Sequence, residues 1–314
     1  HIVAEQQFVI NEFDNVYDEI EEEQQLLVDD TYGSLRIISD DVVIRFERRE
    51  RNQLYSIKVG NEELLQAPMR LNFWRALTDN DRGTRAGSRL GCWRDAGDTP
   101  GIFNNTKWSI EGYKILDDGK KVVVTSGATV CTQPESKASV VYTITSKGME
   151  INLHFYPDPS LPEIPEVSLL FELPKDFENV TYLGNGPEEN YIDRANAAKI
   201  GLYNTTVSDM WVDYLKPQEC GNRTGVRYAT LVGDKKVFSL VAEPVMEFNA
   251  CHWLPKEIEN VWHQKDLPEP NKTVVRCIAR QQGIGGYDSW GAHCNEKYKN
   301  KTDKTYRLKF QIRF

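Results

Sequence analysis

The sequence lacks long apolar runs, closely paired cysteines and helical periodicity. No hydrophobic run approaches the roughly 18 residues of a membrane-spanning helix, and no charged-then-apolar signal segment opens the chain. We therefore expect a cytoplasmic protein with no membrane partner. The absence of a C-x-x-C pair argues against a structural zinc site and favours small buried thiols, at Cys92, Cys131, Cys220, Cys251, Cys277 and Cys294.

Basic residues are in the minority. The chain has 38 lysines and arginines against 47 aspartates and glutamates, which gives a net charge of −9 over 314 residues. Phosphate contacts need clustered Lys and Arg, so the composition argues against nucleic acid as a partner and suits a neutral ligand such as a sugar. A chain of this length buries roughly 75% of its unfolded surface and needs no disulfides to hold its core.

Short strand patterns fill most of the sequence. Apolar and polar residues alternate, or β-branched residues cluster, between turn residues, at 34–38, 42–46, 54–59, 122–125, 139–144, 149–155, 167–173, 226–231, 238–242 and 306–314. No long stretch carries a helical stripe. Many strands without intervening helices predict an all-β fold, a large antiparallel two-layer β-sandwich.

The N-terminal residues depart from this pattern. Residues 1–12 contain one alternating run, which we interpret as the final strand of a preceding domain. Residues 13–32 are acidic and predict a solvated linker, because like charges at this density repel one another. The sandwich domain is then expected at 33–314.

Four segments interrupt the strands, at 68–93, 182–193, 208–227 and 283–290, and loops of this kind often carry function. The first contains Asp79, Asn80 and Asp81, followed by Gly83. Three neighbouring oxygen-bearing side chains suit calcium, but the alternate ligand positions and the later glutamate of an EF-hand are missing. We favour the other interpretation, in which these residues cap a turn and pair with nearby arginines.

The second and third segments contain no evident catalytic pair. Glu188 and Glu189 are adjacent, and adjacent side chains on an extended chain point in opposite directions, so they would not flank one scissile bond. We expect them to have a structural use. The third segment mixes aromatic, acidic and basic residues, which is typical of a salt-linked loop.

The fourth segment reads Gly283-Ile284-Gly285-Gly286-Tyr287-Asp288-Ser289-Trp290. Its glycines allow a tight turn, which Asp288 and Ser289 can fix through side-chain-to-backbone hydrogen bonds. Trp290 has small or polar neighbours, unlike a tryptophan in the alternating pattern of a core strand. Its indole is either offered to a ligand or folded against a sheet edge, and the local sequence alone favours the second arrangement.

Together the four segments resemble a known family. They are similar to the "FWRAPTDND", "GxGPxENYxDR", "PQExGxR" and "GxGGxDSW" segments of the C-terminal domain of glycoside hydrolase family 2 β-galactosidases, at 72–81, 183–194, 217–223 and 283–290. The matches occur in the family's order across roughly residues 35 to 314 of the sequence.

The resemblance implies a fold and a function. The fold is a galactose mutarotase-like β-supersandwich of the "small chain" type. The whole enzyme hydrolyses terminal β-D-galactosyl residues with retention, and the parent is expected to be a homo-oligomer. Its two catalytic glutamates and its magnesium and sodium sites lie in a preceding (β/α)₈ barrel domain, which has no counterpart here. The chain would then contain no catalytic residue, metal or cofactor of its own, and its partners would be that barrel domain and the β-galactoside sugar.

The resemblance also implies a role for the fourth segment. Trp290 stands where the family has a tryptophan in the substrate site, so its expected role is an apolar platform for the sugar, which reverses the local preference for a sheet-edge position. The expected supporting loop residues are Asp288, Ser289, Asp79, Asn80, Asp81 and Gly83. One departure follows Gly83, where an acidic residue of the family is replaced.

Two other functions stay open at this point. The chain could be a stand-alone carbohydrate-binding sandwich that uses Trp290 and other exposed aromatic residues. It could also be a mutarotase-type aldose epimerase, which needs a histidine and a carboxylate converging on the sugar ring. The spacing pairs no histidine with a specific acid, among His1, His154, His252, His263 and His293.

Overall fold

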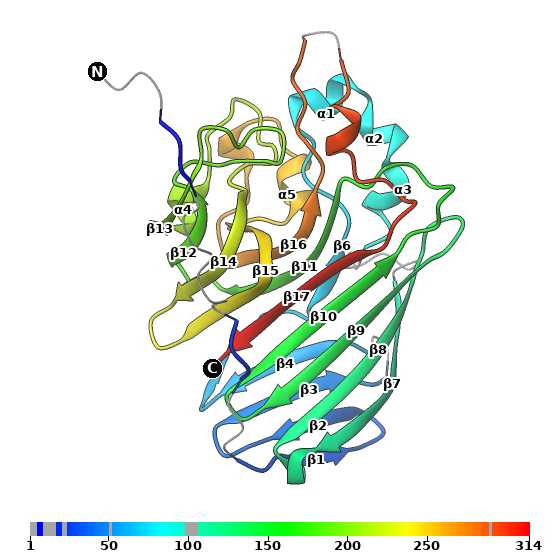
Figure 1. The fold of residues 1–314 in the computed structure, drawn as a ribbon, viewed down its shortest axis with the longest axis vertical. Helices are drawn as coiled ribbons and strands as arrows, with labels where there is room; N and C mark the ends of the chain where they lie inside the picture. Colours follow the sequence, from blue (N-terminus) through cyan, green and yellow to red (C-terminus); the bar gives the residue numbers. More distant parts are fainter. Residues whose placement is uncertain (1–4, 9–16, 21–23, 50–51, 98–105, 289–290) are drawn as a thin grey trace.

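The computed structural model of the chain describes residues 5–8, 17–20, 24–49, 52–97, 106–288 and 291–314. Strands dominate these residues (Figure 1). They are β1 (Leu27–Asp30), β2 (Ser34–Ile38), β3 (Val42–Glu47), β4 (Leu54–Val59), β5 (Glu62–Glu63), β6 (Arg70–Asn72), β7 (Lys107–Leu116), β8 (Lys121–Val130), β9 (Ser136–Thr145), β10 (Gly148–Tyr156), β11 (Glu166–Pro174), β12 (Asn179–Gly186), β13 (Lys199–Thr206), β14 (Arg223–Val232), β15 (Val237–Cys251), β16 (Lys272–Gln281) and β17 (Tyr306–Arg313).

The helices are short and lie in the connections between strands. They are α1 (Asp79–Gly83), α2 (Ala86–Arg89), α3 (Gly91–Arg94), α4 (Val207–Met210) and α5 (Pro255–Glu259), with 3₁₀ turns η1 (Asp117–Gly119), η2 (Gln264–Asp266) and η3 (Glu296–Tyr298). Within the described ranges, no helix is long and apolar enough to cross a membrane.

The strands form two sheets in the described part of the chain. β1 to β5 make a five-stranded sheet in sequence order, and the main path of a twelve-stranded sheet runs β13-β12-β14-β15-β17-β10-β9-β8-β7. β15 pairs with β17 through residues 239–243 and with β16 through residues 247–251, so the large sheet branches there toward β16, β11 and β6. Every strand pairing is antiparallel, and the predicted all-β antiparallel sandwich is confirmed.

One part of the core lies between the five-stranded sheet and the strands β7 to β10 and β17 (Figure 1), and the same core continues through β11, β12, β14, β15 and β16. Every second residue of β8 is buried, and β9 and β10 follow the same alternation along most of their length. The alternating sequence pattern predicted this arrangement. The aromatic rings of Phe46 on β3 and Tyr142 on β9 meet across the layers, with centroids 5.0 Å apart. β11 is buried on nearly every residue, because both of its faces are covered.

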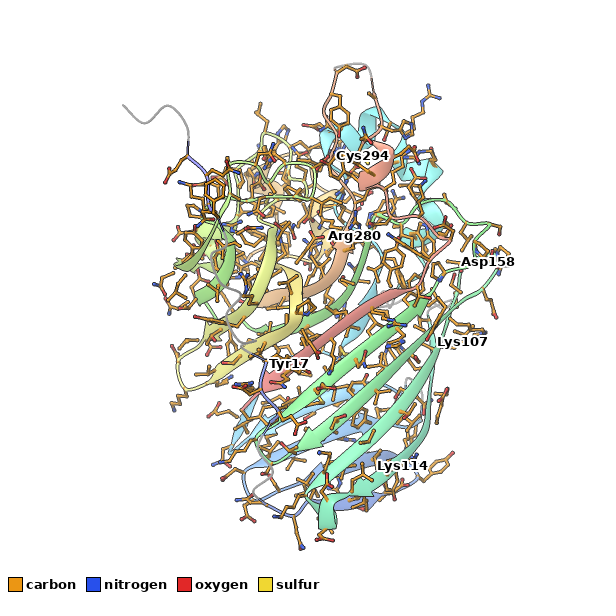
Figure 2. All side chains as sticks on the ribbon, viewed as in Figure 1. Tyr17, Lys107, Lys114, Asp158, Arg280 and Cys294 are labelled. Carbon is orange, nitrogen blue, oxygen red and sulfur yellow. The ribbon has the colours of Figure 1, made fainter. Side chains whose placement is uncertain are left out.

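The described parts of the N-terminal stretch contact the sandwich. Residues 5–8 form no strand, but the Gln7 amide exchanges two hydrogen bonds with the backbone of Ile200 on β13, at 2.9 and 2.7 Å. Farther along, the Tyr17 hydroxyl donates to Glu150 on β10 (Figure 2). Residues 27–30 of the acidic stretch form β1. The boundaries of the preceding domain, linker and sandwich stay predictions.

All six cysteines lie in the described residues and are free thiols. Four are buried, whereas Cys131 is half-buried and Cys92 is exposed. The prediction of small buried thiols therefore applies to four of the six.

The four interrupting segments gather at one end of the molecule. Helices α1, α2 and α3 and the loop that precedes β17 lie at that end, and β1 lies at the opposite end (Figure 1). The fold thus brings together segments that are separated by more than a hundred residues in the sequence.

Candidate functional site

The first segment forms a short capped helix, α1. Asp81 N donates to the Thr78 hydroxyl oxygen, and Thr78 N donates to the Asp81 carboxylate, both at 3.1 Å. Arg75, whose side chain is 1% exposed, donates to the same carboxylate from Nε at 3.1 Å and Nη2 at 2.9 Å. Arg82 pairs with Asp79 at 2.9 Å. The favoured interpretation, that these residues cap a turn and pair with arginines, is confirmed.

Arg75 and Asn80 also hold the start of the glycine loop, which we define as residues 283–292. Arg75 donates to the carbonyl oxygens of Gln282 at 2.5 Å and Gly283 at 3.2 Å. The Asn80 side-chain amide donates to Ile284 O at 3.0 Å. Three consecutive carbonyl groups of the loop base are therefore satisfied by the first segment.

Asp193, from the second segment, holds the same base from the other side. Its carboxylate accepts from Ile284 N at 3.0 Å and Gly285 N at 2.9 Å. A Cβ on Gly283 would lie 2.7 Å from Asp193 Oδ2, and Gly285 and Gly286 have φ values of +69° and +90°. Glycine is therefore required here both for close approach and for left-handed backbone.

The returning side of the loop contacts α1. Gly291 has φ +93°, and a Cβ on it would lie 2.6 Å from Gly83 O. Ala292 N donates to Asp288 Oδ1 at 3.0 Å, as expected of an aspartate that fixes a turn. Ser289 and Trp290 lie outside the described residues. The loop that carries Trp290 is thus anchored at both of its ends.

The third segment contacts α1 as well. Asp79 N donates to the Gln218 side-chain oxygen at 2.8 Å, and Glu219 N donates to Ala76 O at 3.1 Å. Arg82 reaches Pro217 O at 3.5 Å. The segment is fixed by hydrogen bonds to the first segment and by the ion pairs of Glu219 described next.

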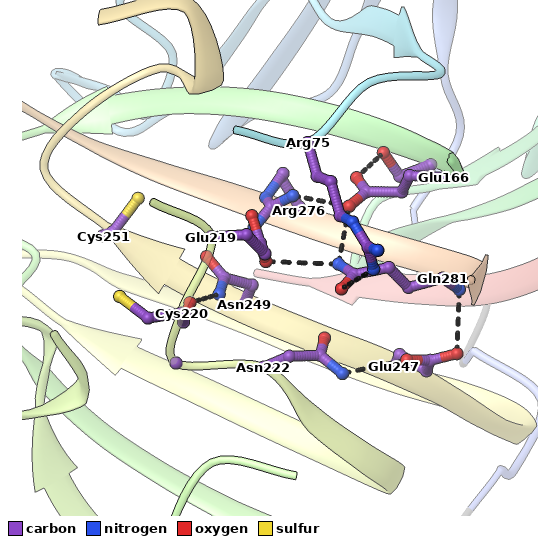
Figure 3. A network of polar contacts seen from close by, with 12 residues as sticks. Arg75, Glu166, Glu219, Cys220, Asn222, Glu247, Asn249, Cys251, Arg276 and Gln281 are labelled. Atoms are coloured by element: carbon purple, nitrogen blue, oxygen red, sulfur yellow. Dashed lines mark hydrogen bonds and ion pairs between the residues drawn. The ribbon is translucent and has the colours of Figure 1, made fainter. Parts of the chain in front are cut away.

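A buried ionic network joins these segments to the sheet (Figure 3). Arg276 on β16 pairs with Glu166 on β11 at 2.5 Å and with Glu219 at 2.6 Å. The Gln281 amide donates to the same two carboxylates, at 2.8 and 3.2 Å. Arg75 joins this network because its guanidinium donates a hydrogen bond to the side-chain oxygen of Gln281, at 3.3 Å.

Burial dominates the electrostatics of this network. Burial raises the pKa of Glu166, although Arg276 opposes the shift. Burial alone would lower the pKa of Arg276, but Glu166 and Glu219 raise it. Burial also raises the pKa of Glu247 to about 7, against hydrogen bonds from Gln281 N and the side-chain amide of Asn222. These groups are enclosed and paired, so their role is to fix the segments and not to meet a substrate.

The second segment is held by Glu189. Its carboxylate accepts from the Tyr214 hydroxyl at 2.5 Å, from Gly221 N at 2.8 Å, and from the Arg194 guanidinium. Glu188 is exposed. The structural use expected for this pair is therefore seen for Glu189.

The described part of the molecule includes two open cavities of several hundred Å³. One of about 390 Å³ lies between β6 and α5 and is lined by residues including Trp74, Arg94 and Glu259. Another of about 520 Å³ is lined by the second segment and by the residues that follow it, within 186–198. The described residues at the base of the glycine loop enclose only about 10 Å³, which is too little for a sugar ring.

One histidine does meet an acid. The Nε2 atom of buried His252 lies 3.1 Å from the carboxylate of Glu178, and its Nδ1 atom lies 2.9 Å from Lys272 O. The sequence spacing gave no indication of this pair. Neither of the two large cavities described above is lined by a histidine.

The fold and the gathered loops define the class of the protein as a large antiparallel β-sandwich with an anchored glycine loop at one end. A family model described as "Beta galactosidase small chain" matches residues 39–312. The chain belongs to this β-galactosidase small chain family.

Individual relatives agree with this assignment. A β-galactosidase from Priestia megaterium is 33% identical, and the match covers 92% of this chain and 27% of that protein. One from Streptococcus thermophilus is 33% identical over 84% of this chain and 25% of that protein. A β-galactosidase small subunit from Latilactobacillus sakei is 26% identical over 90% of this chain and 99% of that subunit. The chain thus spans about a quarter of the two larger relatives and nearly all of the small subunit.

The solved structures that the chain resembles include proteins that are not named as β-galactosidases. A putative aldose 1-epimerase from Escherichia coli K12 has a TM-score of 0.47 at 8% identity, covering 89% of this chain and 98% of that one. A galactose mutarotase-like protein from Clostridium acetobutylicum has a TM-score of 0.47 at 9% identity, covering 93% and 98%.

Sequence reasoning missed the residues that hold the glycine loop. Arg75 and Asp193 lie inside the recognised segments but carry no local sign of their partners. Arg276 gave a usable signal, because a charged residue within an apolar strand run must be paired when the strand is buried.

Proposed function

We propose that the chain is the small-chain component of a retaining β-galactosidase. In this proposal it presents Trp290 to the galactosyl ring, in a site whose two catalytic glutamates lie in a part of the enzyme outside this chain. The observation that carries the proposal is the two-sided anchoring of the glycine loop. Asp193, Arg75 and Asn80 hold its first half, and Gly83 contacts its second half.

Glycoside hydrolysis assigns different roles to this chain and to the part of the enzyme outside it. A retaining glycosidase uses two carboxyl groups about 5 Å apart, one as nucleophile and one as acid and base. Here Glu166 and Glu219 are enclosed by Arg276, and Glu189 is held by Arg194, so none of these is free to serve. The indole of Trp290 would instead cover an apolar face of the sugar and orient it, without moving a proton.

The metal ions implied by the family belong to the other part as well. Among the described residues no group of three or more His, Cys, Asp or Glu side chains is placed to hold a metal ion. Magnesium and sodium stay expectations for the barrel domain, and in this proposal the role of the chain is to complete the sugar site.

Replacement of Trp290 by Ala in the intact enzyme tests the proposal. An aromatic face contact contributes roughly 0.5–1.5 kcal/mol beyond its buried area, so we expect kcat/KM for a chromogenic β-galactoside to fall about tenfold. Trp290→Phe should keep part of the activity, and thermal unfolding should match the wild type in both variants. An unchanged kcat/KM in Trp290→Ala would remove the sugar platform from the proposal.

A further inference from the structure

Two exposed apolar side chains lie on neighbouring loops beside α1, outside the glycine loop. Leu215 is 95% exposed and Trp262 is 70% exposed. The ammonium group of Lys216 lies 3.4 Å from the centre of the Trp262 ring. We call Leu215, Lys216 and Trp262 the tryptophan patch.

The patch rests on an ordered base. The Gln264 amide donates to Tyr214 O at 2.7 Å, which joins the two loops that carry the patch. Beneath it, Trp211 donates to Gln264 at 3.2 Å and packs against Trp253, with ring centroids 4.8 Å apart. The exposed side chains therefore project from loops that are fixed, and not from loose chain.

The patch and the glycine loop share one face of the molecule. Arg82, at the end of α1, reaches Pro217 O at 3.5 Å, two residues from Leu215. The next residue, Gly83, is the one that Gly291 of the glycine loop approaches. Helix α1 is thus a bridge of a few residues between the patch and the loop.

A protein surface fits this patch better than a sugar does. Large apolar side chains at the surface mark interaction sites, and tryptophan is enriched among the residues that contribute most to protein interfaces. A fully exposed leucine has neither a hydrogen-bonding group nor a flat face for a sugar. One face of Trp262 is already covered by Lys216.

The lengths of the relatives indicate which protein this is. The chain matches about a quarter of two β-galactosidases and nearly the whole of a protein named as a small subunit. The same fold thus occurs joined to, or associated with, a much larger remainder. We propose that the tryptophan patch docks the catalytic remainder of the β-galactosidase and so sets the glycine loop against its active site; this inference rests on the proposed function.

Hydroxyl-radical footprinting tests the docking. The 314-residue chain alone and the intact enzyme are oxidised under the same conditions, and modified residues are quantified by mass spectrometry. We expect Leu215 and Trp262 to be oxidised in the chain alone and protected in the intact enzyme. Leu27, which is 64% exposed on β1 at the opposite end, is the internal reference and should react equally in both (Figure 1).

A variant pair tests whether the patch sets the loop. Tyr287, in the glycine loop, is 56% exposed and reports on the loop in the same experiment. In the intact enzyme with Leu215→Glu and Trp262→Glu, Tyr287 should become as reactive as in the chain alone. With the control Leu27→Glu it should stay protected. Circular dichroism confirms that each variant is folded.

Three results would overturn the docking. Leu215 and Trp262 could react equally in the chain and the enzyme. They could be protected in the chain alone and become reactive on dilution, which would indicate contact between two copies. They could be protected in the chain alone only when galactose is added, which would indicate a sugar site. An enzyme that protects the patch yet hydrolyses no β-galactoside would keep the docking and reject the proposed function.

Discussion

Asp193 shows how a single side chain can fix the base of a loop, here the loop that carries the proposed sugar platform, Trp290. Both of its oxygens accept backbone N–H groups of the glycine loop, at Ile284 and Gly285. No other described side chain is seen to accept from these two donors. The carboxylate thus sets the direction in which the loop leaves the sheet, several residues before Trp290.

Replacing Asp193 by Ala should therefore reduce activity more than stability. Two donors lose their partner, at a cost of about 1–3 kcal/mol where they stay shielded from water, and the loop base loosens. We expect KM to rise in the intact enzyme, with partial recovery in Asp193→Asn. Asp158 is a matched control, because its carboxylate also accepts a turn N–H, from Ser160 at 3.0 Å, and lies away from the loop (Figure 2). Equal kinetic effects of the two alanine variants would contradict this role.

Glu247 makes the stability of the chain depend on pH. Burial raises its pKa to about 7 in the folded chain, whereas an unfolded glutamate has a pKa of about 4.3. Between these values the folded state binds more protons than the unfolded state, so the free energy of unfolding decreases as pH rises. Above about pH 7 this contribution becomes constant.

Urea unfolding between pH 5 and 8 can measure this effect. The wild type should lose stability as pH rises toward 7, and Glu247→Gln should have a shallower dependence, because it cannot release a proton. Part of the slope should remain in the variant, since burial also raises the pKa of Glu166. Parallel pH profiles for the two proteins would show that Glu247 does not titrate in this range.

At the scale of elements, α1 and the glycine loop form one unit. The helix contacts the loop through Asn80 at the outgoing chain and through Gly83 at the return. Its own position is set by Arg75, which is tied to the ionic network between β11 and β16. The loop is therefore coupled to the rigid sheet through a helix of five residues.

Replacing Gly291 by Ala should disrupt the contact between α1 and the glycine loop. The added methyl would lie 2.6 Å from Gly83 O, and the residue has φ +93°. Gly119→Ala is a matched control, because Gly119 has a similar positive φ, +89°, but the nearest atom to its Cβ position is 3.9 Å away. Both variants carry a backbone cost of roughly 1 kcal/mol, so the difference between them reports the contact. We expect a clear loss of kcat/KM in the intact enzyme only for Gly291→Ala, and a similar loss in both would point to strain alone.

At the scale of the whole molecule, the described residues supply a scaffold and the two ends of a loop, and most acids of the second segment are engaged within the chain. The larger cavity contains Glu188, Glu189 and Asp193, of which Glu189 and Asp193 are occupied by hydrogen bonds within the chain. Retaining hydrolysis needs two carboxyl groups facing one bond. The described residues do not provide that arrangement.

The purified 314-residue chain should therefore not hydrolyse a chromogenic β-galactoside. Its tryptophan fluorescence should also stay unchanged on titration with galactose, because in the proposed function the sugar site is completed only by the rest of the enzyme. Turnover that survives removal of contaminating enzyme would refute the first expectation. A saturable fluorescence change that Trp290→Ala abolishes would instead support the stand-alone binding module.

The sequence by itself determined the fold class, the family and ten of the strands that the structure describes, whereas β1, β5, β6, β7, β12, β13 and β16 were not predicted. Alternation is a local property, since successive side chains of a strand point to opposite faces, so each run could be recognised without knowledge of its partner. The segment around Asp79 and the loop ending at Trp290 were recognised in the same local way.

Only the tertiary structure decided what holds the candidate site together. Arg276 and Glu166 are 110 residues apart, and Arg75 and Gly283 are 208 residues apart, so no local pattern could pair them. The exposed patch of Leu215 and Trp262 was hidden for the same reason, because exposure depends on which elements the fold leaves uncovered. Burial arises only when the chain packs. It encloses the acids and arginines whose paired contacts position the glycine loop.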